Sequence, residues 1–226
     1  MAQRTAFIEK IRAATAAGRA HRASVNLQAT AAGAYVGGGA DPVQSLLAEW
    51  TAVGGQGARV SGTAAVGDYV RTLITRHQVS SVLRWKHPLL DRLELDRLLR
   101  ELNVSIAGWE ELEQQAAAAR WPAAFAPGLG ITSVDWAVAE TGTLALAARP
   151  GQGRVVSLLP PVYLAILEPS QIVPDLFDLF EKLELEKADL PSNLSLVTGP
   201  SKTGDIELKL TTGVHGPGTV HLLVVE

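Results

Sequence analysis

Apolar side chains recur in two patterns along this chain, one with helical three- and four-residue spacing and one in the short continuous runs of buried strands. The helical spacing predicts helices over residues 4–22, 66–77, 89–102, 110–120, 173–185 and 205–211, and one more that begins at Pro42 with Asp41 as its N-cap. The short runs predict strands at 58–61, 81–85, 104–107, 137–139, 143–147, 155–159, 163–167, 194–197 and 220–225.

The order of these elements predicts the fold class. Up to residue 120 strands and helices alternate, which implies crossovers and parallel pairing. From residue 137 the strands follow one another through short turns at Gly142 and 150–153, which suits antiparallel hairpins. We therefore expect a three-layer α/β/α fold with a mixed, largely parallel sheet over residues 41–226. Residues 1–40 are expected to form an amphipathic helix and a glycine- and alanine-rich linker.

Composition excludes several classes of function. The chain has 226 residues, enough for one sizeable domain, and a formal charge of −3, which gives no basic field for nucleic acid. It has no cysteine, so it can form no disulfide, ligate no iron–sulfur cluster through thiolates and offer no thiol nucleophile. Apolar runs stop well short of the ~20 residues of a membrane helix. These features predict a cytoplasmic protein without a membrane span.

The arginine-rich first helix leaves two interpretations open. An organelle transit segment has this composition, and so does a helix that packs on the domain or on a neighbouring subunit. The second interpretation makes a homodimer possible.

Two polar signatures follow apolar runs. They are residues 139–144, Ala-Glu-Thr-Gly-Thr-Leu, and residues 198–207, Thr-Gly-Pro-Ser-Lys-Thr-Gly-Asp-Ile-Glu; Gly-Val-His-Gly-Pro-Gly follows at 213–218. Polar residues that follow parallel strands meet at the carboxyl edge of the sheet, where open α/β sheets place ligands. The signatures therefore predict a ligand site at that edge.

These segments resemble the lactate-utilisation protein C family, also called the LUD-domain proteins, whose pattern includes G-I-T-x-A-D-x-A-I-A-E-T-G-T-L, L-P, G-P-S-R-T-A-D-I-E and G-V-H-G-P. The matching residues are 130–144, 159–160, 199–207 and 213–217, with Lys202 in place of arginine and Gly204 in place of alanine. The resemblance implies the fold of sugar-phosphate isomerases, glucosamine-phosphate deaminases and coenzyme A transferases.

The resemblance also implies a function, which is a part in a system that oxidises lactate to pyruvate. Such a chain would bind a small carboxylate or phosphate-bearing ligand and hold no cofactor itself, while iron–sulfur partner proteins carry the electrons. The alternative is a stand-alone acyl or coenzyme A transferase or a sugar-phosphate enzyme that uses Glu140.

The signatures supply the candidate site residues. Glu140 can act as a base or nucleophile, or accept hydrogen bonds in its turn, and His215 can move protons, bind an anion or be structural. The 199–205 turn can hold an anion through backbone N–H groups, two hydroxyls and an ammonium, or simply cap a helix. The predicted ligand-binding residues are Thr132, Thr141, Gly142, Thr143, Gly199, Ser201, Lys202, Thr203 and Asp205.

Two kinds of site are not expected. The five histidines do not stand with carboxylates at metal-ligand spacing. Residues 128–133 begin like a dinucleotide fingerprint but lack its last glycine and do not follow a predicted strand, so nicotinamide binding is not expected.

Overall fold

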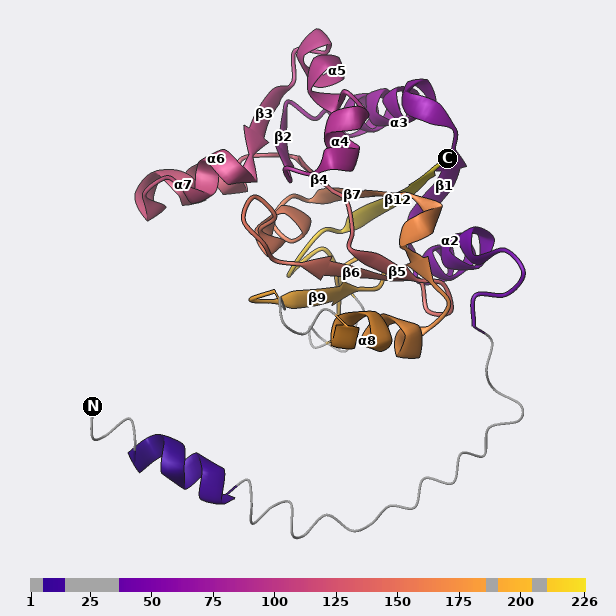
Figure 1. Cartoon of the computed structure of the whole chain (residues 1–226). Helices are drawn as coiled ribbons and strands as arrows, with labels where there is room; N and C mark the ends of the chain where they lie inside the picture. The colour runs from indigo at the N-terminus through magenta and orange to yellow at the C-terminus, as the bar shows by residue number, and fades with distance from the viewer. Residues whose placement is uncertain (1–5, 15–36, 186–190, 205–210) are drawn as a thin grey trace. The chain divides into compact units, whose positions relative to one another are not determined.

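The computed structural model describes residues 6–14, 37–185, 191–204 and 211–226 (Figure 1). Residues 36–226 form one compact unit and residues 1–35 another, in which residues 6–14 are helical. The remainder of the predicted 4–22 helix and residues 29–36 of the predicted linker lie outside the described residues. The sections below concern the larger unit.

The main sheet of this unit has six strands, all parallel, in the order β1-β12-β7-β4-β2-β3. Their bounds are β1 Gln56–Val60, β2 Ser81–Arg84, β3 Ser105–Gly108, β4 Leu129–Thr132, β7 Val162–Leu167 and β12 Thr219–Val225. β4 and β7 are buried along their whole length, as expected for central strands of a sheet covered on both faces. The largely parallel sheet that the alternating pattern predicts is confirmed.

A second sheet of four strands has the order β8-β5-β6-β9. Its strands are β5 Trp136–Val138, β6 Thr143–Ala147, β8 Ile172–Val173 and β9 Leu194–Val197. β6 is antiparallel to both β5 and β9, and β8 is parallel to β5. The antiparallel strands that the short turns predict are thus present, but they form a separate mixed sheet. A further hairpin joins β10, Lys202–Thr203, to β11, Thr211–Thr212.

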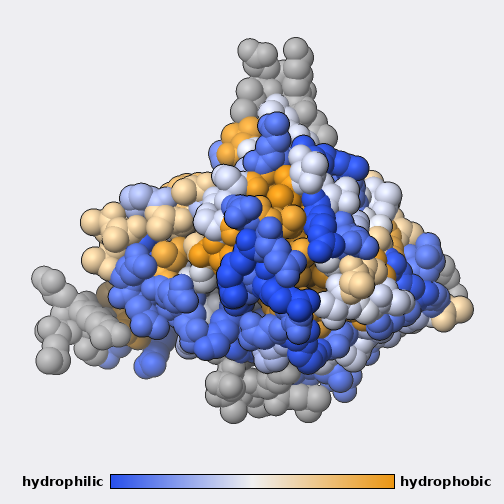
Figure 2. Space-filling model, turned by 90° about the horizontal axis from the view of Figure 1, so that it is seen from above, coloured by the Kyte–Doolittle hydropathy of each residue, from blue (hydrophilic) through white to orange (hydrophobic). Residues whose placement is uncertain are grey.

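Helices cover one face of the main sheet and the second sheet covers the other (Figure 1). α3 Gly62–His77, α4 Pro88–Arg92 and α5 Leu95–Glu101 lie on the helical face, where hydrophilic residues form a band across the middle (Figure 2). α2 Pro42–Ala52 packs against β1, and α8 Leu176–Leu185 lies on the second sheet. Asp41 caps α2 by accepting a hydrogen bond from Gln44 N, as predicted.

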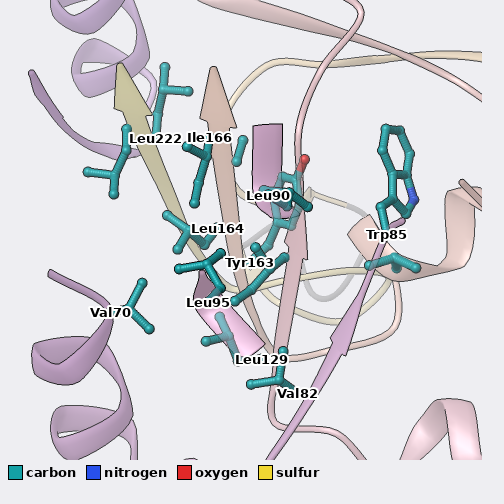
Figure 3. Close-up of a cluster of buried hydrophobic side chains, with 14 of the residues drawn as sticks. Val70, Val82, Trp85, Leu90, Leu95, Leu129, Tyr163, Leu164, Ile166 and Leu222 are labelled. Carbon is teal, nitrogen blue, oxygen red and sulfur yellow. The ribbon is translucent and has the colours of Figure 1, made fainter. Parts of the chain in front are cut away.

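The core lies mainly between the main sheet and α3, α4 and α5 (Figure 3). Val70, Leu90 and Leu95 from these helices belong to one buried cluster with Leu164 and Leu222 of the sheet. Burial of each such side chain contributes about 1.5–3 kcal/mol. The cluster therefore fixes the strand ends that carry the polar residues described below.

Three of the predicted elements differ from the structure. The 89–102 helix is two helices, because Leu93 and Leu95 are out of helical phase and a left-handed residue at Glu94 lets both be buried. The 110–120 helix is also divided, into α6 Trp109–Glu113 and α7 Ala117–Phe125, and α7 extends beyond the predicted end. Residues 154–157 form a 3₁₀-helix, η1, that packs on β4 instead of the predicted strand at 155–159.

The largest omission is β4, a central strand of the main sheet. Its four residues, Leu129–Thr132, include a glycine and follow Pro127 and Gly128, so they carry little strand signal. At the other end of the chain the predicted 205–211 helix falls on residues that are not described, except that Thr211 lies in β11.

Candidate functional site at the carboxyl edge

Three threonine hydroxyls meet at one end of the second sheet. Thr143 Oγ1 is 2.8 Å from Thr141 Oγ1 and 2.8 Å from Thr198 Oγ1. β5 and β9 both run antiparallel to β6, so their carboxyl ends lie together where β6 begins. The two signatures come together here, because the Thr143 hydroxyl of the first contacts the Thr198 hydroxyl of the second. Thr198, which belongs to the second signature, was not among the predicted site residues.

Two glycines of the signatures pack against the carboxyl end of α2. A Cβ at Gly142, whose φ is +63°, would lie 2.6 Å from Trp50 N, and one at Gly199, whose φ is +76°, would lie 2.7 Å from Val53 Cγ2. L side chains rarely adopt these backbone angles. The glycines therefore let the two turns approach the end of the helix.

Lys202 also contacts the carboxyl end of α2. Its exposed side chain donates a hydrogen bond from Nζ to the carbonyl oxygen of Val53, the C-cap of α2. No residue in the last turn of α2 is basic, so Lys202 supplies the cation that a helix carboxyl end favours. Lys202 and Thr203 lie in β10, and most of the residues of the helix predicted after this turn are not described. Asp205 is outside the described residues.

The remaining predicted site residues differ in their burial and in their hydrogen-bond partners. Ser201 N donates to Pro217 O at 2.9 Å, which joins its turn to the 213–218 loop, where the His215 side chain is exposed. Glu140 is partly buried in the β5–β6 turn, and its backbone N donates to Pro174 O at 3.0 Å. Thr132, fully buried at the end of β4, shares a 2.7 Å hydrogen bond with the Tyr163 hydroxyl. Burial raises the pKa of Tyr163 far above its ordinary value.

Most of these residues lie at the amino edge of the main sheet. The 213–218 loop leads into β12, and the Val53 turn that contacts Gly199 and Lys202 leads into β1. The prediction of a site at the carboxyl edge of the parallel sheet is therefore wrong for these residues. The strands that precede them, β5 and β9, belong to the second sheet, and β9 is only partly buried.

The carboxyl edge holds a different group of polar residues. β2 leads through α4 and α5 to β3 on one side, whereas β4 leads through β5 and β6 to β7 on the other. The crevice between β2 and β4 is thus a topological switch point, the usual ligand position in open α/β sheets. A cavity of about 240 Å³ lies there, which we call the switch-point pocket; its lining residues are Trp85, His87, Val134, Asp135, Trp136, Arg149, Gln152 and Gln171.

An ion pair forms one wall of this pocket. Arg149 Nη1 donates to Asp135 Oδ1, and Asp135 Oδ2 accepts a hydrogen bond from Ala147 N at 2.7 Å. Asp135 N also donates to Ala145 O at 3.0 Å, so the carboxylate is fixed to the end of β6. The side chains of Arg149 and Asp135 are 34% and 20% exposed. The guanidinium is therefore held in a defined position within reach of solvent.

The remaining walls are also fixed by hydrogen bonds. Gln171 donates from Nε2 to Val134 O and accepts from Glu168 N at 2.8 Å. Trp85 Nε1 donates to Gly153 O at 2.9 Å, and Gln152 Nε2 donates to Lys86 O at 3.3 Å. Because these bonds join the loop after β2 to the loop after β6, and the loop after β4 to the loop after β7, the pocket is preformed.

His87 contributes an imidazole to the pocket. As the N-cap of α4 it accepts a hydrogen bond at Nδ1 from Leu89 N, with a length of 3.2 Å. Burial lowers the pKa of His87 below its ordinary value, and the Asp135 carboxylate opposes that shift in part. The neutral ring with a proton on Nε2 is the tautomer that agrees with this hydrogen bond.

The described part of the chain offers no group of three or more histidines, aspartates or glutamates placed to hold a metal ion. In the same ranges, none of the helices has the length and apolar character needed to span a membrane.

Residues 43–225 match the model of the LUD domain. The chain belongs to the LUD-domain family. It is 34% identical over 160 residues to lactate utilization protein C of Halalkalibacterium halodurans, which covers 70% of this chain and 67% of that protein. A protein of the same name from a Geobacillus strain is 36% identical over 165 residues, which are 69% of this chain and 66% of the relative. The resemblance inferred from the motifs is confirmed.

The fold has a counterpart among solved structures. A DUF162 family protein from Deinococcus radiodurans superposes with a TM-score of 0.56 at 18% identity, covering 81% of this chain and 95% of that one. This likeness supports the α/β fold of the LUD domain.

The residues of the switch-point pocket were missed by the sequence-based prediction. Asp135 stands inside the first LUD-type motif, six residues before Thr141, but without β4 nothing placed it at the carboxyl edge. His87 follows β2 and precedes Pro88, and this combination indicates a helix N-cap more than a ligand-binding residue. A strand at 129–132 would have been the signal, because it places residues 133–135 beside 85–87.

Proposed function

We propose that this LUD-domain protein takes part in lactate utilisation, and that its own role is to bind a small carboxylic acid in the switch-point pocket. The names of the relatives from Halalkalibacterium and Geobacillus support the first part. The observation that carries the second part is a preformed polar cavity with a fixed arginine at the topological switch point of the main sheet.

The size and charge of the pocket support a small acid. Its volume of about 240 Å³ is below the range of roughly 300–1,000 Å³ that is typical for drug-sized ligands. Arg149 presents a planar set of N–H donors suited to a carboxylate, and Asp135 fixes the orientation of that plane. The apolar ring surfaces of Trp85 and Trp136 can contact the short carbon chain.

A partner would have to carry the electrons if lactate is oxidised in the same system. The chain has no cysteine and therefore no thiolate for an iron–sulfur cluster. We propose that iron–sulfur proteins work beside this chain, as the resemblance implies. The alternative transferase function rests on Glu140, which lies in the turn after β5 and is not among the residues that line the pocket. No observation at the pocket favours that alternative.

Calorimetric titration of the purified protein with L-lactate and pyruvate tests the proposal. Arg149→Gln should weaken binding about ten- to a hundredfold, because a charge-assisted contact contributes roughly 1.5–3 kcal/mol. Arg149→Lys should give an intermediate affinity, since it keeps the charge but loses the planar donor set. Arg154→Gln is the matched control, because Arg154 is exposed in the same connection and does not line the pocket.

Two results would contradict the proposal. One is the absence of any heat of binding for both acids at millimolar concentration. The other is an equal loss of affinity in Arg149→Gln and Arg154→Gln, which would indicate a general effect of surface charge. Growth on lactate of cells that carry only the Arg149→Gln form would test the cellular role in parallel.

A further inference from the structure

We infer that the switch-point pocket selects acids that carry an oxygen on the carbon next to the carboxylate, and that His87 is the residue that recognises this oxygen. The inference rests on the proposed function, because it assumes that the acid binds beside Arg149. It adds a specificity residue, which would distinguish 2-hydroxy and 2-oxo acids such as lactate and pyruvate from other small carboxylic acids.

The orientation of His87 is set by its own backbone environment. Its Nδ1 accepts a hydrogen bond from Leu89 N in the first turn of α4, and the ring lines the same cavity as Arg149. Nδ1 faces the helix, so Nε2, on the other side of the ring, is the nitrogen available to a ligand. In a neutral imidazole with Nδ1 as acceptor, Nε2 carries the proton and donates.

The ring stays neutral near pH 7 because its pKa lies below the ordinary value of 6.5, mainly through burial. The charged groups around it are Asp135, Arg92, Asp91 and Glu168, of which the carboxylates partly offset the effect of burial. A neutral N–H donor can meet a keto or hydroxyl oxygen, but it gains no ion pair with a second carboxylate. His87 and Arg149 therefore offer two different kinds of contact within one small cavity.

This division of contacts predicts which acids bind. When the carboxylate of the acid binds the guanidinium of Arg149, the next carbon of the acid lies against the pocket wall. An oxygen on that carbon satisfies the Nε2 donor, whereas an acid without it leaves a partly buried donor unpaired. Sites built to hydrogen-bond a ligand oxygen discriminate strongly against the analogue that lacks it.

Calorimetry with L-lactate, pyruvate and propionate tests the inference, since propionate lacks only the oxygen on the second carbon. The native protein should bind propionate about tenfold more weakly than the other two acids. His87→Asn should bind all three acids with similar affinity, close to that of propionate in the native protein. Asparagine is a good N-cap and replaces the hydrogen bond to Leu89 N, but its short side chain does not reach into the pocket.

The outcomes separate this inference from the proposed function. Equal binding of the three acids to the native protein would overturn the role of His87 and leave acid binding at Arg149 intact. Persistence of the lactate preference in His87→Asn would also overturn it. Absence of binding for all three acids would overturn the proposed function and the inference together. If His87→Asn unfolds at a clearly lower temperature, His87→Ser, which also caps helices, provides the same comparison.

Discussion

The two ends of the β5–β6 hairpin carry polar side chains that are used in different ways. At the amino edge of the main sheet, the hydroxyls of Thr141, Thr143 and Thr198 bond to one another and Lys202 bonds to the end of α2. At the carboxyl edge, Asp135 and Arg149 stand beside a cavity with imidazole and amide groups around it. The first end joins elements, and the second presents donors to a space that a ligand can fill.

A glycine-rich signature can serve close packing between elements as well as ligand binding. Gly142 and Gly199 occur where turns approach the backbone of another element, in this case the end of α2. Such close packing needs glycine for the same steric reason that a phosphate-binding loop does. A glycine next to threonine and lysine is therefore compatible with packing alone, and the neighbouring cavity decides between the two uses.

The largest effect on stability is expected from a substitution at the amino edge. Gly142→Ala places a Cβ 2.6 Å from Trp50 N at a φ of +63°. The left-handed backbone and the contact with a helix backbone together should lower the free energy of unfolding by about 3 kcal/mol. Chemical denaturation measures this loss. Pyruvate affinity of the molecules that remain folded should be unchanged.

Gly204→Ala is the matched control, since a Cβ there meets nothing within 4 Å. Its effect should stay within about 0.5 kcal/mol. A loss of pyruvate affinity in folded Gly142→Ala would show that the two ends of the hairpin are coupled, and the comparison drawn above would then be wrong.

Acid should destabilise the protein through His221 of β12. Burial lowers the pKa of His221 from 6.5 to about 4, with further lowering by His77 and Arg76. Its Nδ1 is 2.8 Å from the Tyr69 hydroxyl, and its Nε2 has no partner in the described part of the chain. The unfolded chain therefore binds a proton at a higher pH than the folded protein does.

This difference in proton affinity makes the folded protein less stable in acid. The stability associated with neutral His221 is present above pH 6.5 and is lost as the pH falls toward 4. We expect a loss of about 2 kcal/mol, less than the full shift implies because the structure around a buried charge can relax. Denaturation at several pH values measures it. His221→Gln should flatten the dependence by about one proton, and an unchanged slope would assign the acid sensitivity to other groups.

Much of the fold could be predicted from the sequence because its strands and helices have strong local patterns. α2, with its Asp41 N-cap, and β12, with its continuous apolar run, are examples. β4 could not be found in this way, because four residues with a glycine carry little β propensity and its strand conformation depends on pairing with β2 and β7. Residues 154–157 show the reverse case, in which an apolar run becomes a 3₁₀-helix because it packs on β4.

The same dependence on tertiary structure limited the prediction of the site. Thr141 and Thr143 belong to one local signature, and the tight hairpin turn between β5 and β6 brings their hydroxyls together. The switch-point pocket instead joins residues from four connections, those that follow β2, β4, β6 and β7, such as His87, Asp135 and Gln171. Only the order of strands in the sheet brings them together, and that order was not available without β4.

A smaller effect is expected at Lys202, and it sharpens the comparison between the two ends. Lys202→Ala removes the cation from the carboxyl end of α2, which should lower the free energy of unfolding by about 0.5 kcal/mol for an exposed group. Lys202→Arg should restore most of it. Thermal unfolding of the three forms measures the difference, and titration with lactate and pyruvate should give equal affinities. A tenfold weaker affinity in Lys202→Ala would instead place an anion site at the amino edge.

The smallest effect is expected at Glu140, which tests whether the amino edge has chemistry of its own. Glu140→Gln conserves side-chain volume in the partly buried β5–β6 turn and keeps the backbone bond from residue 140 to Pro174, so stability should change by less than about 0.5 kcal/mol. Trp136, at the other end of β5, lines the switch-point pocket, and Glu140 does not. Affinity for lactate and pyruvate should therefore stay within about twofold of the native value. If cells with Glu140→Gln fail to grow on lactate while the variant is folded and binds pyruvate normally, the carboxylate acts in a step that ligand binding does not report. In that case the amino edge would be functional, and the threonine cluster would be its scaffold.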